Sequence, residues 1–284
     1  MEDDTLIDRW LSTFRNPKTR TAYSLNLKQF AEWLNGSLPT VERGTLTAYA
    51  EHLAKMRCEK TGEPLSISAQ SRALSALRSF YRYLAEEEVI AKNPAAALEL
   101  PKAKDELAQR IITEAEFYKL LTLEENPRNR LLIELLYATG GRISEALGAQ
   151  WKDATARDEG GQIVLFGKRD KTRTVLIPAS VWAKLIATRG NAGDEAYIFP
   201  SARTDGHLSA SQAWRIVRKA ALVAGLGKNV SPHWFRHAHA SHAIDRGAPL
   251  SLVKETLGHS SLSTTSRYVH ARPDDSSGLY LSIK

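Results

Sequence analysis

Six polar residues in the second half of the chain have the types and the order needed to cleave a phosphodiester. They are Arg142, Lys168, His233, Arg236, His259 and Tyr268. Arginine, lysine and histidine side chains can surround one phosphate and stabilise the negative charge that develops on its oxygens during attack. A tyrosine hydroxyl can make that attack and form a covalent ester. The set therefore predicts DNA strand breakage through a phosphotyrosine.

The two arginines are expected to bind the phosphate, because a planar guanidinium donates two parallel hydrogen bonds and an ammonium group does not. Arg142 follows a glycine pair and precedes an apolar helical segment, so we expect it at the start of a helix. Arg236 lies three residues after His233, a spacing that places both side chains on one helix face. His233 and His259 can exchange a proton with the tyrosine or bind the phosphate.

A lysine is the expected general acid, because the sugar 5′-oxygen leaves poorly without a proton. Such an acid contributes roughly 10²–10⁴-fold to the rate. Lys168 lies in a basic turn between two β-branched apolar runs, 162–166 and 173–177, which predict a β-hairpin. Lys171 lies in the same turn and remains an alternative to Lys168.

Helical periodicity dominates the rest of the chain. Apolar residues recur at helical spacing in segments 23–34, 46–53, 68–87, 130–138, 143–147, 209–224, 232–246, 250–257 and 263–270. Thr19 or Thr21 could cap the first of these helices, and Thr113 with Glu116 forms a capping box for another. The sequence thus predicts a mainly α-helical protein with a small β-hairpin or sheet.

Two domains are expected, because 284 residues exceed the usual size of one small domain. The segment 101–109 begins with a proline, is rich in charge and lacks periodicity, which is typical of a linker. We expect a helical DNA-binding domain over residues 1–100 and a mixed α/β catalytic domain over residues 110–284.

The charge of the chain favours a polyanionic partner. Its net charge is +7 and its sequence pI is about 9.4. Residues 1–100 contain 13 Lys+Arg and 13 Asp+Glu, so residues 101–284, with the remaining 26 and 19, carry the whole excess. Ten basic residues are candidates for DNA contact, with a solvated surface as the alternative. They are Lys18, Arg20, Arg72, Arg78, Arg82, Arg169, Lys171, Arg173, Arg215 and Lys219.

Several other classes of protein and site are disfavoured. The acidic N-terminus and the lack of a long apolar run argue against an export signal and a membrane span. Cys58 is the only cysteine, which favours a reducing cytoplasm. As a DNA-binding protein it is expected at the nucleoid. His237, His239 and His242 could suggest a metal site, but no cysteine or carboxylate cluster and no His-Glu-x-x-His motif accompanies them. No glycine-rich phosphate loop occurs, so no nucleotide cofactor is indicated either. We therefore expect neither a metal nor a nucleotide cofactor.

Four separated motifs resemble those of the tyrosine recombinases, the integrase family. Residues 137–147, YATGGRISEAL, are similar to the first box of that family, and residues 231–238, SPHWFRHA, to the second box with its His-x-x-Arg. Residues 257–268, LGHSSLSTTSRY, resemble the box that ends in the nucleophile. Lys168 ahead of the run 173–175 matches the lysine of the family's β-hairpin. The order and spacing agree over residues 110–270, and residues 1–100 resemble the helical core-binding domain more loosely.

The resemblance implies a role for each residue. Arg142 and Arg236 would clamp the scissile phosphate, with Glu145 supporting Arg142. Lys168 would protonate the leaving 5′-hydroxyl, while His233 and His259 would assist proton transfer. Tyr268 would become joined to the 3′-phosphate, and rejoining would need no cofactor because the ester keeps the bond energy.

The resemblance also implies partners. The two domains would form a clamp around double-stranded DNA that carries inverted-repeat half-sites. Four chains, in a homo- or hetero-tetramer, would exchange strands through a Holliday junction, and a partner recombinase or an accessory protein could take part. The compact two-domain length resembles the Xer recombinases, which resolve chromosome dimers, and integration or excision of a mobile element stays open.

Two features depart from the family pattern. Gly141 stands where the family commonly has leucine, and could loosen the loop that carries Arg142. Only 16 residues follow Tyr268, and their apolar members could dock onto a neighbouring subunit or pack on their own domain.

The alternative functions are a type IB topoisomerase-like enzyme, which nicks and swivels DNA, and a catalytically silent architectural DNA-binding protein.

Overall fold

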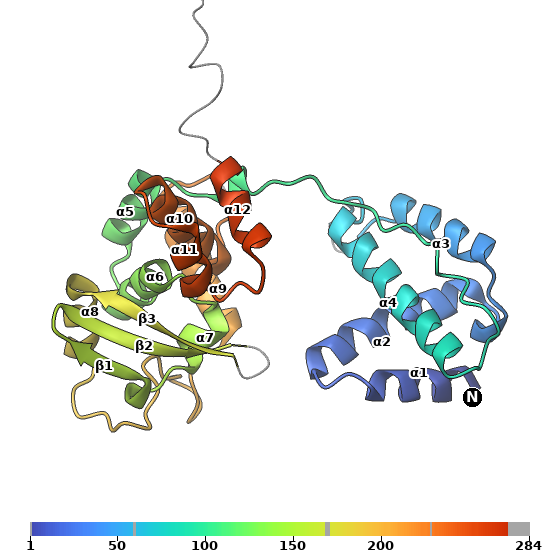
Figure 1. Ribbon diagram of the computed structural model, residues 1–284, viewed down its shortest axis with the longest axis horizontal. Helices are drawn as coiled ribbons and strands as arrows, with labels where there is room; N and C mark the ends of the chain where they lie inside the picture. Colours follow the sequence, from blue (N-terminus) through green and yellow to red (C-terminus); the bar gives the residue numbers. More distant parts are fainter. Residues whose placement is uncertain (1, 59–60, 168–170, 228, 272–284) are drawn as a thin grey trace, which may run out of the picture. The chain divides into compact units, whose positions relative to one another are not determined.

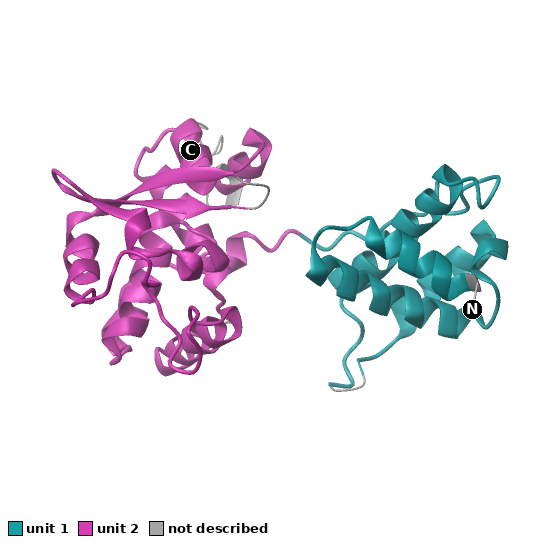
Figure 2. Ribbon diagram, turned by 90° about the horizontal axis from the view of Figure 1, so that it is seen from below, with its two compact units in different colours: residues 1–104 teal, residues 105–284 magenta. Residues whose placement is uncertain are grey.

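The structure is a computed structural model that describes residues 2–58, 61–167, 171–227 and 229–271. The chain divides into two compact units, Met1–Lys104 and Asp105–Lys284, which Figure 2 shows in different colours. The second half of the predicted linker, residues 105–109, therefore belongs to unit 2, where Leu107 is buried. In the part of the chain that the structure describes, no helix has the length and apolar character to cross a membrane.

Unit 1 is helical, with a core that combines aromatic rings with aliphatic side chains. Its elements are α1 (Glu2–Ser12), α2 (Pro17–Leu34), the short η1 (Leu38–Thr40), α3 (Arg43–Lys55) and α4 (Ile67–Glu86) (Figure 1). Trp10 of α1 stacks on Tyr23 of α2 with 5.5 Å between ring centroids, and meets Phe80 of α4 edge-on at 5.4 Å. Leu27 and Phe30 of α2 are fully buried, so the apolar faces of α2 and α4 point inward and leave their basic residues on the surface.

Helix α2 begins earlier than its apolar periodicity predicts. Asn16 caps it, since the Asn16 side chain accepts a hydrogen bond of 2.9 Å from the backbone N–H of Lys18. The prediction that Thr19 or Thr21 caps this helix was wrong. Pro17 explains the difference, because proline fits the first turn of a helix, where its missing N–H costs nothing.

Unit 2 combines a three-stranded antiparallel sheet with eight α-helices in its described residues (Figure 1). Its elements are η2 (Ala108–Arg110), α5 (Glu114–Leu123), α6 (Pro127–Thr139), α7 (Ile143–Gly148), η3 (Trp151–Asp153), β1 (Ala154–Arg157), β2 (Gly160–Phe166), β3 (Thr172–Pro178), α8 (Ala179–Ala187), α9 (Ala210–Val223), α10 (Pro232–Asp245), α11 (Leu250–Leu257) and α12 (Leu262–Ala271). The mainly helical fold with a small sheet is confirmed, and the capping box of Thr113 and Glu116 is present at the start of α5.

The sheet contains the predicted hairpin and one strand more. Strands β2 and β3 pair with Val164 opposite Thr174, and β1 adds to the other edge of β2 with Thr155 opposite Gln162. Buried residues alternate along β2, which gives the period that the sequence reveals. In β1 only Ala154 is buried, so that strand leaves no such alternation to recognise.

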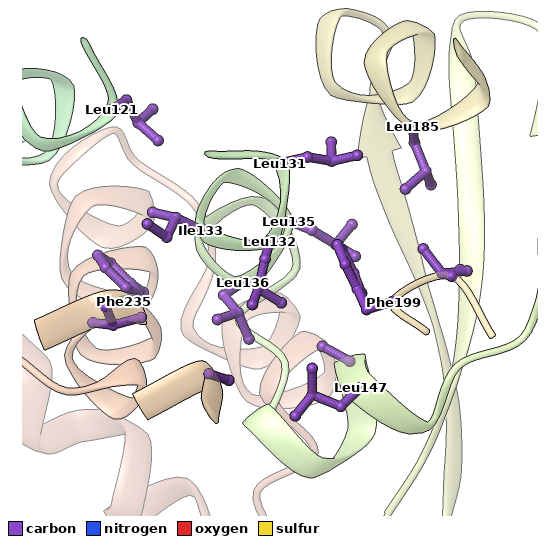
Figure 3. Packing of buried hydrophobic residues seen from close by; sticks show 14 of the residues in the cluster. Leu121, Leu131, Leu132, Ile133, Leu135, Leu136, Leu147, Leu185, Phe199 and Phe235 are labelled. Atoms are coloured by element: carbon purple, nitrogen blue, oxygen red, sulfur yellow. The ribbon is translucent and has the colours of Figure 1, made fainter. Parts of the chain in front are cut away.

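Helix α6 is the centre of the unit 2 core. It is buried on nearly every side, with Leu132 and Leu136 among its fully covered residues, and the helices and the sheet surround it (Figure 3). A helix with so many buried positions is held in place by packing from several directions. The core therefore fixes the point where α6 ends, at the left-handed Gly140 that leads into Arg142.

Gly140 tests how closely the end of α6 is packed. Its φ is +57°, and an added Cβ would lie 2.7 Å from Cδ2 of Leu257 and 2.8 Å from Cδ2 of His239. We expect Gly140→Ala to lower the free energy of unfolding by about 3 kcal/mol, from left-handed backbone strain together with overpacking. The matched control is Gly190→Ala, with φ +52° and no heavy atom within 4 Å, where only the strain of about 1 kcal/mol remains. Urea unfolding measures both, and equal losses in the two variants would contradict the close packing.

Candidate active site

Arg236 lies at the meeting point of two helix ends in unit 2. Its side chain is 2% exposed, and its guanidinium donates to the backbone oxygens of Gly140, at 2.7 Å, and Leu257, at 2.6 Å. These oxygens belong to the C-terminal ends of α6 and α11, where the helix dipoles place partial negative charge. Burial and neighbouring positive charges lower the pKa of Arg236 to about 10, so it stays protonated at neutral pH. The described contacts of this buried cation are thus carbonyl oxygens, which orient it without cancelling its charge.

The end of α11 also positions His259. Gly258 turns the chain at φ +64°, and the backbone N–H of His259 donates back to the carbonyl oxygen of Lys254 at 3.1 Å. A second arginine supports this turn, because Nε of Arg173 donates to the carbonyl oxygen of Thr256 at 2.6 Å. Two arginines therefore satisfy consecutive carbonyls at this helix end, which would otherwise need solvent.

Glu145 connects Arg142 with Arg173. One carboxylate oxygen accepts from the guanidinium of Arg142 at 2.8 Å, and the other accepts from the backbone N–H of Arg142 at 2.8 Å and from Arg173 at 2.7 Å. Burial of Glu145 alone would raise its pKa, but the hydrogen bonds from both arginines outweigh it and lower the pKa. Arg142 lies at the start of α7, as predicted, with 39% of its side chain exposed.

Arg142 and His259 line one open cleft of about 840 Å³. Arg173 and the exposed Lys171 also line it, beside Gly167. Lys168 and Arg169, two of the predicted site residues, lie outside the described residues. Gly141 is buried just before the cleft, and Leu165 occupies the space beside it, 3.2 Å from the position of an added Cβ.

The histidines around Arg236 carry lowered pKa values. Burial, followed by the charges of Arg236 and Arg142, lowers the pKa of His259 to about 4 and also lowers that of His233. Burial, followed by His233 and Arg236, lowers the pKa of His237 to about 3. All three imidazoles are therefore neutral at neutral pH, and the positive charge of the site belongs to its arginines.

Tyr268 lies on α12 and is 4% exposed. Its ring packs with the buried residues Leu107, Ile111, Ala240, Val253 and Leu257. Its hydroxyl is hydrogen-bonded to Nδ1 of His237 at 2.9 Å, and its ring is parallel to that of His259, with 6.4 Å between centroids. Burial raises the pKa of Tyr268 despite the opposing charges of Arg236 and Arg267, so the hydroxyl is protonated.

Two further contacts hold α12. Nδ1 of His259 lies 2.9 Å from the hydroxyl of the fully buried Thr265. Arg267 makes an ion pair with Asp105 at 2.8 Å, in which both side chains are more than half exposed. The ion pair keeps the pKa of Asp105 low, chiefly through the hydrogen bond from Arg267. Asp105, at the start of unit 2, and His259, near its end, therefore both hold the helix that carries Tyr268.

The structure thus brings five of the six predicted chemical residues into one part of unit 2. They are Arg142, His233, Arg236, His259 and Tyr268. Helices α10, α11 and α12, which carry or precede four of them, pack against one another (Figure 1). Two contacts could not be inferred from the sequence pattern, those of Arg173 with Glu145 and of His237 with Tyr268. The only signal for His237 is its position one helical turn after His233 and directly after Arg236.

The predicted DNA-contact residues divide by exposure. Eight of the ten are exposed: Lys18, Arg20, Arg72, Arg78, Arg82, Lys171, Arg215 and Lys219. In unit 1, Arg78 and Arg82 line a surface cavity together with Tyr23 and Ser75, and Arg72 lines a second cavity that shares the last two residues. Arg173 differs, because its guanidinium is occupied by Glu145 and a backbone carbonyl.

The clustered histidines of α10 have partners other than a metal. Nδ1 of His239 lies 2.7 Å from the backbone oxygen of Tyr137, and Nδ1 of His242 lies 2.8 Å from the hydroxyl of the same tyrosine. Over residues 2–58, 61–167, 171–227 and 229–271, no group of three or more histidine, cysteine or carboxylate side chains could hold a metal ion.

Two family models match the chain. Residues 110–274 match the phage integrase family, and residues 7–91 match the phage integrase N-terminal SAM-like domain. Tyrosine recombinase XerD of Pseudomonas aeruginosa is 36% identical over 282 residues, which cover 93% of this chain and 92% of the relative.

Solved structures give the same fold. The XerH site-specific recombinase bound to a palindromic difH substrate, in a post-cleavage complex, superposes with a TM-score of 0.71 at 26% identity and covers 88% of this chain and 76% of that chain. The lambda integrase tetramer bound to a Holliday junction has a TM-score of 0.75 at 19% identity, with 96% and 78% covered, and supports the fold alone.

Replacement of Glu145 tests the arginine network. We expect Glu145→Gln to lower the free energy of unfolding by about 3 kcal/mol at neutral pH, because it leaves Arg173 buried without its anion. Since folding lowers the pKa of Glu145, its contribution is complete above the ordinary glutamate pKa of about 4.3 and disappears as pH falls through the folded value. The difference between wild type and variant, measured by urea unfolding, should therefore shrink in acid.

The control for this prediction is Glu106→Gln, which removes an exposed ion pair with Arg110 and should change stability little at any pH. A difference for Glu145→Gln that stays constant down to strong acid would contradict the role of its charge.

Proposed function

The chain belongs to the phage integrase family, whose tyrosine recombinases cleave and rejoin DNA, and we propose that it performs site-specific recombination of the Xer type. Two findings support this choice within the family. The relative XerD matches nearly the whole length of both chains, and the two units correspond to an N-terminal SAM-like match and a C-terminal integrase match. Integration or excision of a mobile element is the other use of the same chemistry.

The observation that carries the proposal is the charge arrangement around Arg236. Of three guanidiniums, those of Arg142 and Arg173 are hydrogen-bonded to one carboxylate, Glu145, whereas that of Arg236 donates to backbone carbonyl oxygens. Two positive charges are thus left for an anion, and a phosphodiester in the attacked state carries the charge that guanidiniums stabilise best. Arg142 and Arg236 are proposed to clamp the scissile phosphate, with Glu145 holding Arg142 in position.

Tyr268 is proposed as the nucleophile, joined during the reaction to the DNA 3′-phosphate. Its hydroxyl is protonated, so attack requires a proton acceptor. His233 and His259 are the proposed proton-transfer and phosphate-binding groups, because both are neutral in the free protein and a bound phosphate would raise their pKa values.

Lys168 is proposed to protonate the leaving 5′-oxygen, and Lys171 remains the alternative. Lys171 lies between β2 and β3 and lines the cleft beside Arg142. Single replacement of each lysine by alanine, assayed with a 5′-thiolate leaving group that needs no proton, would tell which of them is the acid.

The proposed partner is double-stranded DNA with inverted-repeat half-sites. The related XerH acts on a palindromic substrate, and lambda integrase forms a tetramer on a Holliday junction. We propose that this chain likewise acts as a homo- or hetero-tetramer on DNA, together with a partner recombinase or an accessory protein, in the cytoplasm at the nucleoid. Exposed basic residues of unit 1, including Arg72, Arg78 and Arg82, are proposed to contact phosphates.

Covalent capture tests the proposal. The protein is incubated with fragmented genomic DNA, denatured, and the DNA attached to protein is sequenced. We expect the wild type to enrich one palindrome-like site and Tyr268→Phe to bind DNA without any attachment, because the phenylalanine lacks the attacking oxygen. Attachment by Tyr268→Phe would identify another nucleophile.

The captured sequences also separate the alternatives. A site at the chromosome terminus supports dimer resolution, and a site at an element boundary supports integration. Attachment without sequence preference, with relaxation of supercoils and no strand transfer, would favour a topoisomerase. DNA binding without attachment would favour an architectural protein.

Arg236→Lys tests the clamp. The lysine keeps the charge but cannot donate to the carbonyls of both helix ends and to a phosphate in one plane. We expect cleavage of the captured site to fall at least 100-fold, in line with the loss of one positioned donor, while DNA affinity changes little. Near-normal cleavage would contradict bidentate binding by Arg236.

A further inference from the structure

His237 lies between two of the proposed active-site residues without belonging to the predicted set. Its Nδ1 is 2.9 Å from the hydroxyl of Tyr268, and its ring meets that of His233 edge-on, with 4.4 Å between centroids. It directly follows Arg236 on α10. One imidazole therefore contacts the nucleophile, and the same imidazole contacts a residue of the phosphate site.

The orientation of the Tyr268 hydroxyl depends on this contact. The residues that pack around the ring of Tyr268, among them Leu107, Val253 and Leu257, present apolar side chains. A buried phenol needs a partner for its hydroxyl, because an unsatisfied polar group costs about 1–3 kcal/mol. The partner that the structure provides is His237, so the hydroxyl points toward the face of α10 that carries His233.

The other histidine near Tyr268 makes a different contact. Nδ1 of His259 is hydrogen-bonded to Thr265, and the ring of His259 lies parallel to the ring of Tyr268 at 6.4 Å. In the described contacts, the two histidines thus have different hydrogen-bond partners. His259 is held by the side chain of Thr265, and His237 holds the hydroxyl.

We propose that His237 is a positioning residue for the nucleophile, which fixes the Tyr268 oxygen next to the phosphate site through its Nδ1. This inference rests on the proposed function of Tyr268. During attack the bond from the Tyr268 oxygen to phosphorus forms, the bond from phosphorus to the 5′-oxygen breaks, and the phenolic proton leaves. His237 is too weak a base to keep that proton, because burial and its positive neighbours lower its pKa to about 3. It orients the hydroxyl, while His233 or His259 accepts the phenolic proton and Lys168 or Lys171 donates a proton to the leaving 5′-oxygen.

Three substitutions separate a hydrogen bond from simple packing. His237→Phe keeps the volume of the ring and removes the hydrogen bond. His237→Asn places an amide close to the position of Nδ1, whereas His237→Gln places it close to the position of Nε2. His207→Asn, at an exposed histidine bonded to the backbone oxygen of Leu208, is the control.

The first readout needs no DNA. With ¹³Cζ-labelled tyrosine, the resonance of Tyr268 is assigned from its absence in Tyr268→Phe. We expect this resonance to shift in His237→Phe and His237→Gln and to stay near its wild-type position in His237→Asn. An unchanged resonance in His237→Phe would overturn the hydrogen bond itself, whether or not the protein cleaves DNA.

The second readout is the single-turnover rate of covalent attachment to the captured site at saturating DNA. We expect His237→Phe and His237→Gln to lose 10-fold or more, as expected for a misplaced nucleophile. His237→Asn and His207→Asn should stay within about 3-fold and keep the wild-type thermal midpoint, and the DNA dissociation constant should be unchanged in all four variants. Wild-type or faster attachment by His237→Phe, or an equal loss in His237→Asn, would overturn the positioning role. A wild type that attaches to no DNA would instead refute the proposed function and leave the spectroscopic result standing.

Discussion

The buried guanidinium of Arg236 is the interaction on which the active site of unit 2 depends. It satisfies carbonyl oxygens at the ends of α6 and α11, which would otherwise lack donors in a place without solvent. Both helix ends turn through a left-handed glycine, Gly140 and Gly258, because a side chain there would be strained. The chain that leaves each turn carries a residue of the site: Arg142 follows the first and His259 the second. One buried cation therefore sets the place of two further functional groups.

The electrostatic state of the free protein is matched to an anionic ligand. The arginines carry the positive charge, while burial keeps Tyr268 protonated and the imidazole of His259 neutral. An arriving phosphate supplies the negative charge that a protonated imidazole requires. Proton movement at Tyr268, the proposed nucleophile, is thus linked to the presence of the substrate, and an empty site has little tendency to generate a reactive phenolate.

Local patterns predicted most of the fold and part of the site. The helical periods, the capping box of Thr113, the hairpin and the position of Arg142 at a helix start all depend on residues close together in the chain. Strand β1 was missed, since four residues with one buried position carry no readable alternation. The contacts of Arg173 with Glu145 and of His237 with Tyr268 join residues 28 and 31 positions apart. Such pairs are decided by how the elements pack, and spacing in the sequence does not encode them.

The ion pair between Asp105 and Arg267 connects the helix of Tyr268, the proposed nucleophile, to the segment that joins the units. Asp105 is the first residue of unit 2, and Arg267 directly precedes Tyr268. Residues 101–104 directly precede Asp105. A force on this connecting segment is therefore transmitted to α12 through the ion pair of Asp105 with Arg267. That contact is exposed on both sides and so is readily broken and screened by salt. Tension in the connecting chain and a rise in ionic strength therefore weaken the same ion pair. The mobility of α12 thus depends on mechanical force as well as on salt.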